Sequence, residues 1–372
     1  MDPRIENGQA KKPTRRLQDL GQSLWLDNID RKLLKSGKLQ SYIDDFSVTG
    51  LTSNPTIFDK AIGESDAYDA AIRKAAPQTR STEALFFELA LQDLTTAAKL
   101  FEPAFEASHA MDGWASLEVS PLLADETAGS VNAAVDLHSR VKSPNLFIKI
   151  PGTAAGMPAI EEAIFRGVPI NVTLLFSREQ YLAAAGAYQR GVQRRLDAGL
   201  DPRVHSVASL FVSRWDVAVA KQAPTELKNK LGIAVSQQVY RAYCELHDSS
   251  RWRALSSQGA LKQKLLWAST GTKDPQASDT LYIEALAAPD TINTMPDKTL
   301  LAFADHGKLR GVMPRDGGDS QEVLAAFAAA GIETAALSER LLKEGTEAFA
   351  KSWHELMHRV ADKAKHLKAS AA

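Results

Sequence analysis

The sequence predicts an α/β protein folded as a single (β/α)8 TIM barrel with additional helices. Short apolar runs alternate about eight times with longer helical patterns, which favours a parallel sheet joined by right-handed crossovers. A chain of 372 residues suits one such barrel with insertions. A doubly wound open sheet is the structural alternative, but no GxGxxG motif follows the first predicted strand.

Eight short runs rich in apolar residues are predicted to be the barrel strands. They cover residues 23–29, 46–52, 115–120, 145–150, 169–176, 207–212, 264–269 and 279–286. Helical periodicity predicts helices at residues 81–101, 158–166, 178–198, 234–247 and 322–330, and from residue 334 onward. Residues 1–20 are predicted to be a flexible leader, and residues 21–372 to form one barrel domain that includes the C-terminal helix.

The composition argues against several classes of protein. Charge is nearly balanced, with 44 basic and 45 acidic residues, so the chain lacks the basic excess of a nucleic-acid binder. The single cysteine, Cys244, excludes an intramolecular disulfide and a zinc site built from several cysteines. No signal-peptide core and no apolar run of membrane-spanning length are present, so we expect a cytoplasmic protein with no membrane partner.

Polar side chains interrupt the apolar pattern on four of the predicted strands. Because side chains alternate along a strand, the lysine of NLFIKI lies on the face opposite its two isoleucines. The inner faces assigned in this way carry Asp27, Glu118 and Lys149 on three strands, and Asn171, Thr173 and Leu175 on a fourth. In a barrel these faces converge, and groups near the carboxyl ends of the strands form the active site.

Each of these residues has an ordinary structural explanation when it is taken alone. Lys149 could reach water from the edge of the sheet, and Asp27 could cap a turn or helix. Asn54 could shape the TSNPT turn, and Glu118 could be half of an ion pair. Together, however, one lysine, two carboxylates and two amides are the groups needed for imine chemistry.

Imine chemistry explains why these residue types belong together. A lysine must be neutral to attack a ketone, and burial in an apolar barrel favours the neutral form. The iminium that results accepts electrons, so that a carbon–carbon bond can break. One carboxylate then takes the proton of the hydroxyl that becomes the aldehyde, a second acid–base group handles water, and the amides hold substrate hydroxyls.

Several segments of the chain resemble the transaldolase family, in its long bacterial type. They are VTGLTSNPTIF, NLFIKIPGT, GVPINVTLLFSREQY, SLFVSRWD and the downstream LYIEALAAPDTINTMPDKTL. The resemblance extends over approximately residues 20 to 350. It implies transfer of a dihydroxyacetone unit from sedoheptulose 7-phosphate or fructose 6-phosphate to glyceraldehyde 3-phosphate or erythrose 4-phosphate, in the non-oxidative pentose phosphate pathway. It also implies sugar-phosphate substrates. We expect no cofactor or metal, because the lysine itself supplies the electron sink, and we expect a monomer or homodimer.

The resemblance assigns four catalytic residues. Lys149 matches the lysine that forms the Schiff base, and Asp27 matches the aspartate that assists proton transfer at the cleaved carbinol. Glu118 matches the glutamate that works through a bound water, and Thr173 matches the threonine that helps to position this water.

The resemblance also assigns the residues that bind substrate. Asn54 and Asn171 match two asparagines that bind substrate hydroxyls or the adduct. Ser209 and Phe211 match residues that line the pocket. Arg214 resembles the arginine that binds the substrate's phosphate, a role that suits a planar guanidinium.

The end of the seventh predicted strand departs from the family pattern. Ser269 matches the family's serine, but the arginine that follows it in relatives is missing from WASTGTKDP. Lys273 is predicted to supply this second phosphate-binding charge. The alternative is that Lys273 is a solvated loop lysine.

A segment near the C-terminus suggests a different enzyme. HELMH matches the HExxH zinc-protease pattern, with His354 and His358 as ligands and Glu355 as general base. The one candidate for a third ligand, His366, lacks the metzincin spacing. Apolar residues recur here at helical spacing, so a helix that packs on the barrel is the favoured interpretation.

Two further functions remain open from the sequence. A fructose 6-phosphate aldolase would use the same lysine but would release the three-carbon unit instead of transferring it. The presence of Glu118 rather than a tyrosine favours transfer, by resemblance alone. A barrel that only binds phosphorylated metabolites would leave Lys149, Asp27 and Glu118 unexplained.

Overall fold

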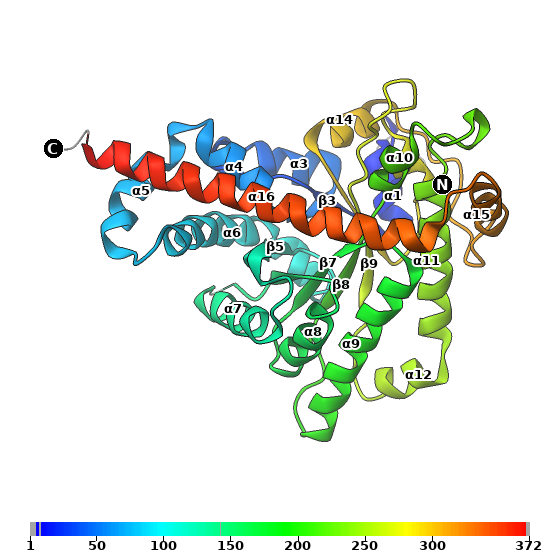
Figure 1. Cartoon of the computed structure of the whole chain (residues 1–372), viewed down its shortest axis with the longest axis horizontal. Helices are drawn as coiled ribbons and strands as arrows, with labels where there is room; N and C mark the ends of the chain where they lie inside the picture. The colour runs from blue at the N-terminus through cyan, green and yellow to red at the C-terminus, as the bar shows by residue number, and fades with distance from the viewer. Residues whose placement is uncertain (1–4, 7–8, 142, 370–372) are drawn as a thin grey trace.

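Eight parallel strands close into a barrel that helices connect and cover (Figure 1). The computed structural model describes residues 5–6, 9–141 and 143–369. Around the barrel the strands follow in the order β10, β3, β4, β5, β6, β7, β8 and β9, and β10 pairs with both β3 and β9. The predicted (β/α)8 barrel with additional helices is therefore confirmed.

The elements have the following bounds. The barrel strands are β3 (Gln22–Leu26), β4 (Val48–Thr52), β5 (Ala115–Glu118), β6 (Leu146–Pro151), β7 (Ile170–Leu175), β8 (Ser206–Phe211), β9 (Lys264–Ala268) and β10 (Thr291–Met295). The helices are α1 (Pro13–Asp19), α2 (Arg31–Lys35), α3 (Lys38–Phe46), α4 (Pro55–Gly63), α5 (Asp69–Ala75), α6 (Thr82–Ala107), α7 (Thr127–Arg140), α8 (Gly156–Phe165), α9 (Arg178–Asp197), α10 (Ser213–Val219), α11 (Leu231–Asp248), α12 (Ser250–Ser256), α13 (Leu281–Ala285), α14 (Asp297–His306), α15 (Ser320–Ala329) and α16 (Thr334–Ala369). Short 3-10 turns lie at η1 (Asp66–Tyr68), η2 (Ala76–Gln78), η3 (Pro121–Leu123) and η4 (Thr225–Leu227), and a small antiparallel pair, β1 (Ile5–Glu6) and β2 (Gln9–Ala10), precedes α1.

The prediction of the eighth strand is wrong. Residues 281–285 form the helix α13, and the strand lies further on, at β10. Helix formation here is supported by Glu284, whose carboxylate accepts hydrogen bonds from Thr280 Oγ1 (2.8 Å) and from the backbone N–H of Lys308 (2.9 Å). The true strand, TINTM, carries two threonines and an asparagine, so its apolar signal is weak, although threonine is β-branched and fits a strand well.

The predicted flexible leader also differs from the structure in part. Residues 1–4 and 7–8 lie outside the described residues. Pro13–Asp19, however, forms α1, which begins with a proline in its first turn and packs on β3 and α14. Leu17 of this helix is completely buried in the core. The packed core of the domain therefore includes residues that were predicted to be flexible.

Aromatic rings fill the amino end of the barrel interior. Trp114 stacks on Phe147 with the ring centroids 4.1 Å apart, and Trp25 lies 6.2 Å from the same phenyl ring. Gly50 leaves room for this indole, because a Cβ at Gly50 would lie 2.6 Å from atoms of Trp25. His205 lies 5.0 Å from the Trp114 ring. These rings close the barrel on the side opposite the polar residues.

Helix α16 crosses the molecule along the side of α4, α5 and α6 and reaches β7 (Figure 1). Trp353 of α16 packs its indole edge-on against Phe86, with ring centroids 5.2 Å apart. Arg359 makes two hydrogen bonds to the carboxylate of Asp59, at 2.6 and 3.2 Å. Because these contacts come from distant parts of the chain, they hold α16 beside the carboxyl end of the barrel.

Strand β7 contains a backbone irregularity that changes which side chains face inward. Leu174 has a φ of 59°, in the left-handed region that non-glycine residues rarely adopt. The register with β8 shifts at this point, so that Leu175 pairs with Leu210, between the inward-facing Ser209 and Phe211. The prediction that Leu175 shares the inner face with Asn171 and Thr173 is therefore wrong, because strict alternation ends at Leu174.

None of the helices in the described part of the chain combines the length and the apolar character needed to cross a membrane.

Candidate active site

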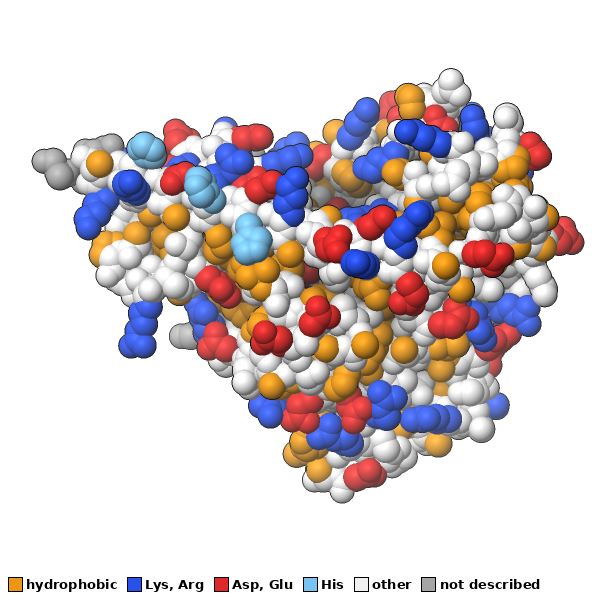
Figure 2. Space-filling view, in the orientation of Figure 1, with side chains coloured by type: hydrophobic (Ala, Val, Ile, Leu, Met, Phe, Trp, Pro, Cys, Tyr) orange, Lys and Arg blue, Asp and Glu red, His pale blue; other side chains and the backbone are white. Residues whose placement is uncertain are grey.

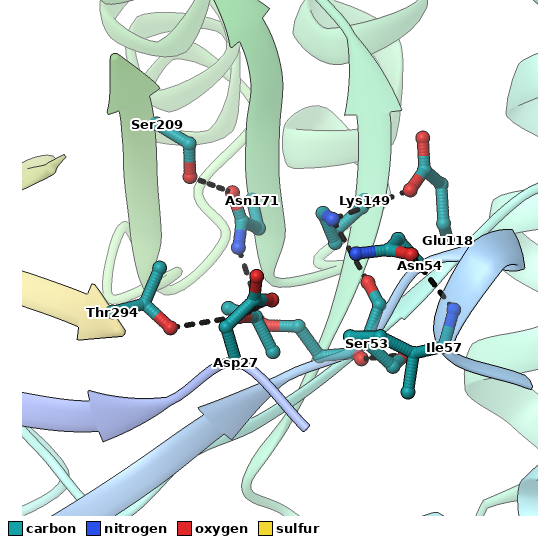
Figure 3. Close-up of polar contacts among 11 residues, drawn as sticks. Asp27, Ser53, Asn54, Ile57, Glu118, Lys149, Asn171, Ser209 and Thr294 are labelled. Atoms are coloured by element: carbon teal, nitrogen blue, oxygen red, sulfur yellow. Dashed lines mark hydrogen bonds and ion pairs between the residues drawn. The ribbon is translucent and has the colours of Figure 1, made fainter. Parts of the chain in front are cut away.

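Lys149 lies at the centre of a polar cluster in the barrel, on β6 (Figure 3). Lys149 is only 5% exposed, and its Nζ donates a hydrogen bond of 3.0 Å to the backbone oxygen of Ser53. The same Nζ lies 3.2 Å from Oε2 of Glu118, which is in register with Lys149 on the neighbouring strand β5. The lysine is therefore held inside the barrel and does not reach water from the edge of the sheet.

One carboxylate oxygen of Glu118 pairs with Lys149, and the other has an unused capacity for hydrogen bonds. Burial raises the pKa of its carboxyl above the usual range, although Lys149 beside it acts in the opposite direction. The other carboxylate oxygen, Oε1, is buried and has no hydrogen-bond partner among the described residues. Thr173 Oγ1, on β7, is also buried without a partner among those residues. Buried polar atoms of this kind call for a ligand or a water molecule that completes their hydrogen bonds.

Asp27 follows the last residue of β3 and faces the same space. Its Oδ1 accepts a hydrogen bond of 2.7 Å from Thr52, whose hydroxyl is 2.8 Å from that of Thr294 on β10. Burial raises the pKa of Asp27, and the hydrogen bond from Thr52 and the positive charges of Lys149 and Lys273 oppose this rise. The site therefore contains two carboxyl groups whose pKa values are raised above their ordinary range by burial.

The two predicted amides have different environments. Asn54 caps the amino end of α4, and its side-chain oxygen accepts a hydrogen bond of 3.0 Å from the backbone N–H of Ile57. It lines the cavity at the barrel mouth. Asn171 is completely buried, donates to Ser116 Oγ (3.2 Å) and accepts from Ser209 Oγ (2.7 Å). Asn171 thus lies beneath the cavity, in register with Lys149.

A cavity of about 360 Å³ opens above these groups at the carboxyl end of the barrel. A volume of this order is typical of a small-molecule site. Nine of the eleven predicted site residues line it: Asp27, Asn54, Lys149, Thr173, Ser209, Phe211, Arg214, Ser269 and Lys273. The other two, Glu118 and Asn171, lie next to Lys149 in neighbouring strands but do not line the cavity. The structure therefore brings all eleven residues to one end of the barrel.

The residues predicted to bind phosphate lie on the loops and helix that follow β8 and β9. Arg214 is in the first turn of α10, and its guanidinium lies 5.4 Å from the centre of the Phe211 ring. Burial lowers the pKa of Arg214, but arginine remains charged at neutral pH. Ser269, with a φ of 56°, places its Oγ 2.9 Å from that of Ser213. Lys273 lines the cavity, and its role in binding phosphate stays a prediction.

The structure adds cavity residues that the sequence analysis missed. Thr52 and Thr294 hold Asp27 in place, as described above, and the backbone of Ser53 accepts the lysine's hydrogen bond. Lys60 of α4 and Phe349 of α16 also line the cavity. Position on β4 could have suggested Thr52, but Phe349 lies in the C-terminal helix, far along the sequence from the barrel strands, and no local pattern points to it.

The HELMH segment does not form a zinc site with the described residues. His354 and His358 lie on the exposed side of α16, where histidine side chains are visible on the surface (Figure 2). His358 Nδ1 is 3.1 Å from Asp362, one turn further along the same helix. Among the residues that the structure describes, no group of three or more histidine, cysteine, aspartate or glutamate side chains could hold a metal ion. The buried face of this segment, which includes Trp353 and Leu356, packs on the molecule instead.

Comparison with known proteins agrees with this geometry. Residues 24–360 match the family model described as Transaldolase/Fructose-6-phosphate aldolase. A transaldolase from Saccharopolyspora erythraea is 43% identical over 353 residues, which cover 93% of this chain and 96% of the relative. A transaldolase from Thermobifida fusca is 44% identical over 358 residues, or 94% of this chain and 97% of the relative. One from Mycolicibacterium paratuberculosis is 42% identical over 91% of this chain and 93% of the relative. The chain therefore belongs to the transaldolase/fructose-6-phosphate aldolase family of enzymes.

Proposed function

We propose that this enzyme transfers a dihydroxyacetone unit between sugar phosphates through a Schiff base on Lys149. The donor is a ketose phosphate, such as sedoheptulose 7-phosphate or fructose 6-phosphate. The acceptor is an aldose phosphate, such as glyceraldehyde 3-phosphate or erythrose 4-phosphate. The observation that carries the proposal is the position of Lys149. This buried lysine lines the cavity at the barrel mouth, as Asp27 does, and its Nζ lies 3.2 Å from Oε2 of Glu118. The proposed setting is the non-oxidative pentose phosphate pathway, in the cytoplasm.

Glu118 is placed to manage protons while the imine forms. Its contact with Nζ lets the lysine pass a proton to the carboxylate, so that the neutral amine attacks the C2 carbonyl of the ketose. The carbinolamine then loses its hydroxyl as water, with a proton returned from Glu118. A water molecule held by the free oxygen of Glu118 and by Thr173 Oγ1 would relay this proton, as the family resemblance implies. The raised pKa of Glu118 suits it to both directions of transfer.

Asp27 is placed to act in the step that breaks the carbon–carbon bond. It takes the proton of the C4 hydroxyl, the C3–C4 bond breaks, and the bonding electrons pass to the iminium to give an enamine on Lys149. The aldose phosphate leaves. An incoming aldose phosphate is attacked by the enamine at its aldehyde carbon, and Asp27 returns the proton to the new hydroxyl. Addition of water to the new iminium then releases the product ketose and restores the lysine.

Transfer rather than release is the function that the comparisons favour. The family model covers both transaldolases and fructose 6-phosphate aldolases, but the curated relatives cited above are all transaldolases. Release would require a proton to reach the enamine carbon before an acceptor aldehyde does. An assay with fructose 6-phosphate and erythrose 4-phosphate distinguishes the two functions. We expect sedoheptulose 7-phosphate and glyceraldehyde 3-phosphate as products, and free dihydroxyacetone as the sole three-carbon product would instead establish the aldolase.

The Schiff base itself can be tested by trapping. The enzyme is incubated with fructose 6-phosphate and borohydride, and the adduct is located by mass spectrometry. We expect a dihydroxyacetone-sized adduct on Lys149 that is absent from Lys149→Ala. Lys264, at the start of β9, provides a matched control, because Lys264→Ala removes a lysine from a barrel strand outside the cavity and should leave the adduct in place. An active wild-type enzyme without an adduct would contradict the mechanism.

A further inference from the structure

Arg214 has an unusual environment for a half-buried cation. Its side chain makes no hydrogen bond and no ion pair with any residue that the structure describes. The carboxylate of Glu344 on α16 acts on Arg214 only electrostatically, without contact. The guanidinium instead lies beside a pair of phenyl rings, 5.4 Å from the centroid of Phe211 and 5.9 Å from that of Phe349. Both rings also line the mouth cavity, and their centroids are 6.5 Å apart. The donors of Arg214 are therefore not used by any carboxylate within the described part of the chain.

One of these two rings comes from the C-terminal helix. Phe349 is 6% exposed and lies on the face of α16 that turns toward the barrel. One turn earlier, Gly345 allows the helix to come close, because a Cβ at that position would lie 3.1 Å from Leu174 and 3.4 Å from Arg214 Nη1. Leu174 is the residue with the left-handed backbone in β7. Two successive turns of α16 thus contact the side of the cavity that carries Arg214.

We propose that Phe349 is a positioning residue, through which α16 holds the Arg214 guanidinium ready to bind the phosphate of a sugar-phosphate substrate. This inference rests on the proposed function for the identity of the ligand. It gives α16 a part in substrate binding in addition to its packing on α4, α5 and α6.

The choice of aromatic neighbours has a physical reason. A carboxylate partner would hold Arg214 firmly, but it would occupy the N–H donors and repel an incoming phosphate. An aromatic face attracts the cation through its quadrupole without accepting the N–H hydrogen bonds at the edge of the guanidinium. Two rings therefore fix the position of Arg214 and leave its donors available. In this arrangement the phosphate does not have to displace a protein anion before it binds.

A purely structural role for Phe349 is the alternative, and Trp353 provides the matched control. Both are aromatic residues on the buried face of α16, one turn apart. The Trp353 ring packs on Phe86 and Phe87, and the residue does not line the cavity. If aromatic packing of α16 were the whole explanation, Phe349→Leu and Trp353→Leu would affect the site in the same way.

The test measures the dissociation constant for inorganic phosphate, from the phosphate-dependent rise of the unfolding temperature of each full-length variant. We expect Phe349→Leu to weaken phosphate binding about 3- to 10-fold, the size of the loss of one partly desolvated cation–π contact. Trp353→Leu should lower the unfolding temperature but leave the dissociation constant within twofold of wild type. In an Arg214→Ala background, Phe349→Leu should have no further effect, because Phe349 acts through Arg214.

Kinetics supply a second readout. For fructose 6-phosphate, Phe349→Leu should raise KM with little change in kcat, whereas trapping of unphosphorylated dihydroxyacetone on Lys149 should be unchanged. Phosphate binding at wild-type strength in Phe349→Leu would overturn the inference, as would an equal weakening in Trp353→Leu or no phosphate binding by the wild type. If phosphate binding follows the expectation but no adduct forms on Lys149, the positioning role stands and the proposed function fails.

Discussion

The two ends of the barrel interior differ in how completely their groups are satisfied. At the amino end, aromatic rings stack within 4.1 to 6.2 Å of one another. The two indole N–H groups have partners, because Trp25 Nε1 donates to Asp112 (2.9 Å) and Trp114 Nε1 donates to the backbone oxygen of Ala110 (2.9 Å). At the carboxyl end, Glu118 Oε1 and Thr173 Oγ1 are buried without a partner among the described residues.

This difference separates stability from chemistry along a single strand. On β6, Phe147 belongs to the aromatic layer and Lys149, two residues later, belongs to the polar layer. The aromatic layer is closely packed and complete, so changes to it should mainly alter the free energy of unfolding. The polar layer has unused hydrogen-bonding capacity and carboxyls with raised pKa values, so changes to it should mainly alter rates.

The largest effect should come from Glu118→Gln. The amide has the shape of the carboxyl but cannot accept and return a proton, so we expect kcat to fall by about 10²- to 10⁴-fold. The unfolding temperature should change little, because the substitution also removes a buried acid whose charge is costly to desolvate. Steady-state assays and thermal denaturation of the same preparation measure both quantities. A fall in kcat of less than tenfold would show that Glu118 is not the group that manages protons.

The opposite outcome is expected for Phe147→Ala in the aromatic layer. Removing a phenyl ring that is 2% exposed should lower the free energy of unfolding by about 3–5 kcal/mol, from lost burial and the cavity that remains. The kcat of the folded fraction should stay within a few-fold of wild type. Denaturant unfolding gives the free energy, and Phe147→Leu, which keeps most of the apolar volume, should show a smaller loss. A large fall in kcat per folded molecule would mean that the two layers are coupled.

The sequence allowed most of the fold to be predicted, because the barrel strands are buried on both faces and read as short apolar runs. Seven strands were located to within a few residues. The eighth was missed because TINTM carries three polar residues in a strand of five, whereas LYIEA, which forms α13, shows a misleading apolar alternation. Which of two short segments joins a sheet depends on closure of the barrel, and neighbouring residues in the sequence carry no information about that.

The site could be predicted where it depends on side-chain alternation and on resemblance. Alternation along β5 and β6 correctly grouped Glu118 with Lys149. Alternation failed after Leu174, because a left-handed residue in β7 reverses the direction of Leu175, and leucine gives no signal for such a conformation. The contribution of Phe349 could not be predicted either, since it depends on how α16 returns to the barrel.

A smaller effect should follow from Thr173→Val, in the polar layer. Valine has the shape of threonine without the hydroxyl, so the variant removes one hydrogen bond to the proposed water or adduct, and we expect kcat to fall about 10-fold. The free energy of unfolding should be unchanged or slightly higher, because a buried hydroxyl without a protein partner is lost. Thr173→Ser, which keeps the hydroxyl, serves as the control and should retain most of the activity.

The smallest effect concerns the change in the free energy of unfolding with pH. Acid should lower the stability contributed by the aromatic layer but not that contributed by the polar layer. Burial beside Trp114 lowers the pKa of His205 to about 4, below its ordinary 6.5, so the unfolded chain binds this proton first. The aromatic layer should therefore lose stability as pH falls from about 6.5 toward 4. Asp27 and Glu118 have raised pKa values and bind protons first in the folded state, so acid relieves their burial cost.

Unfolding free energies between pH 7 and 4 should thus decline less steeply in His205→Gln than in wild type. Some decline should remain in that variant, because burial also lowers the pKa of His247 to about 4. An unchanged slope in His205→Gln would mean that the aromatic layer does not contribute to acid sensitivity.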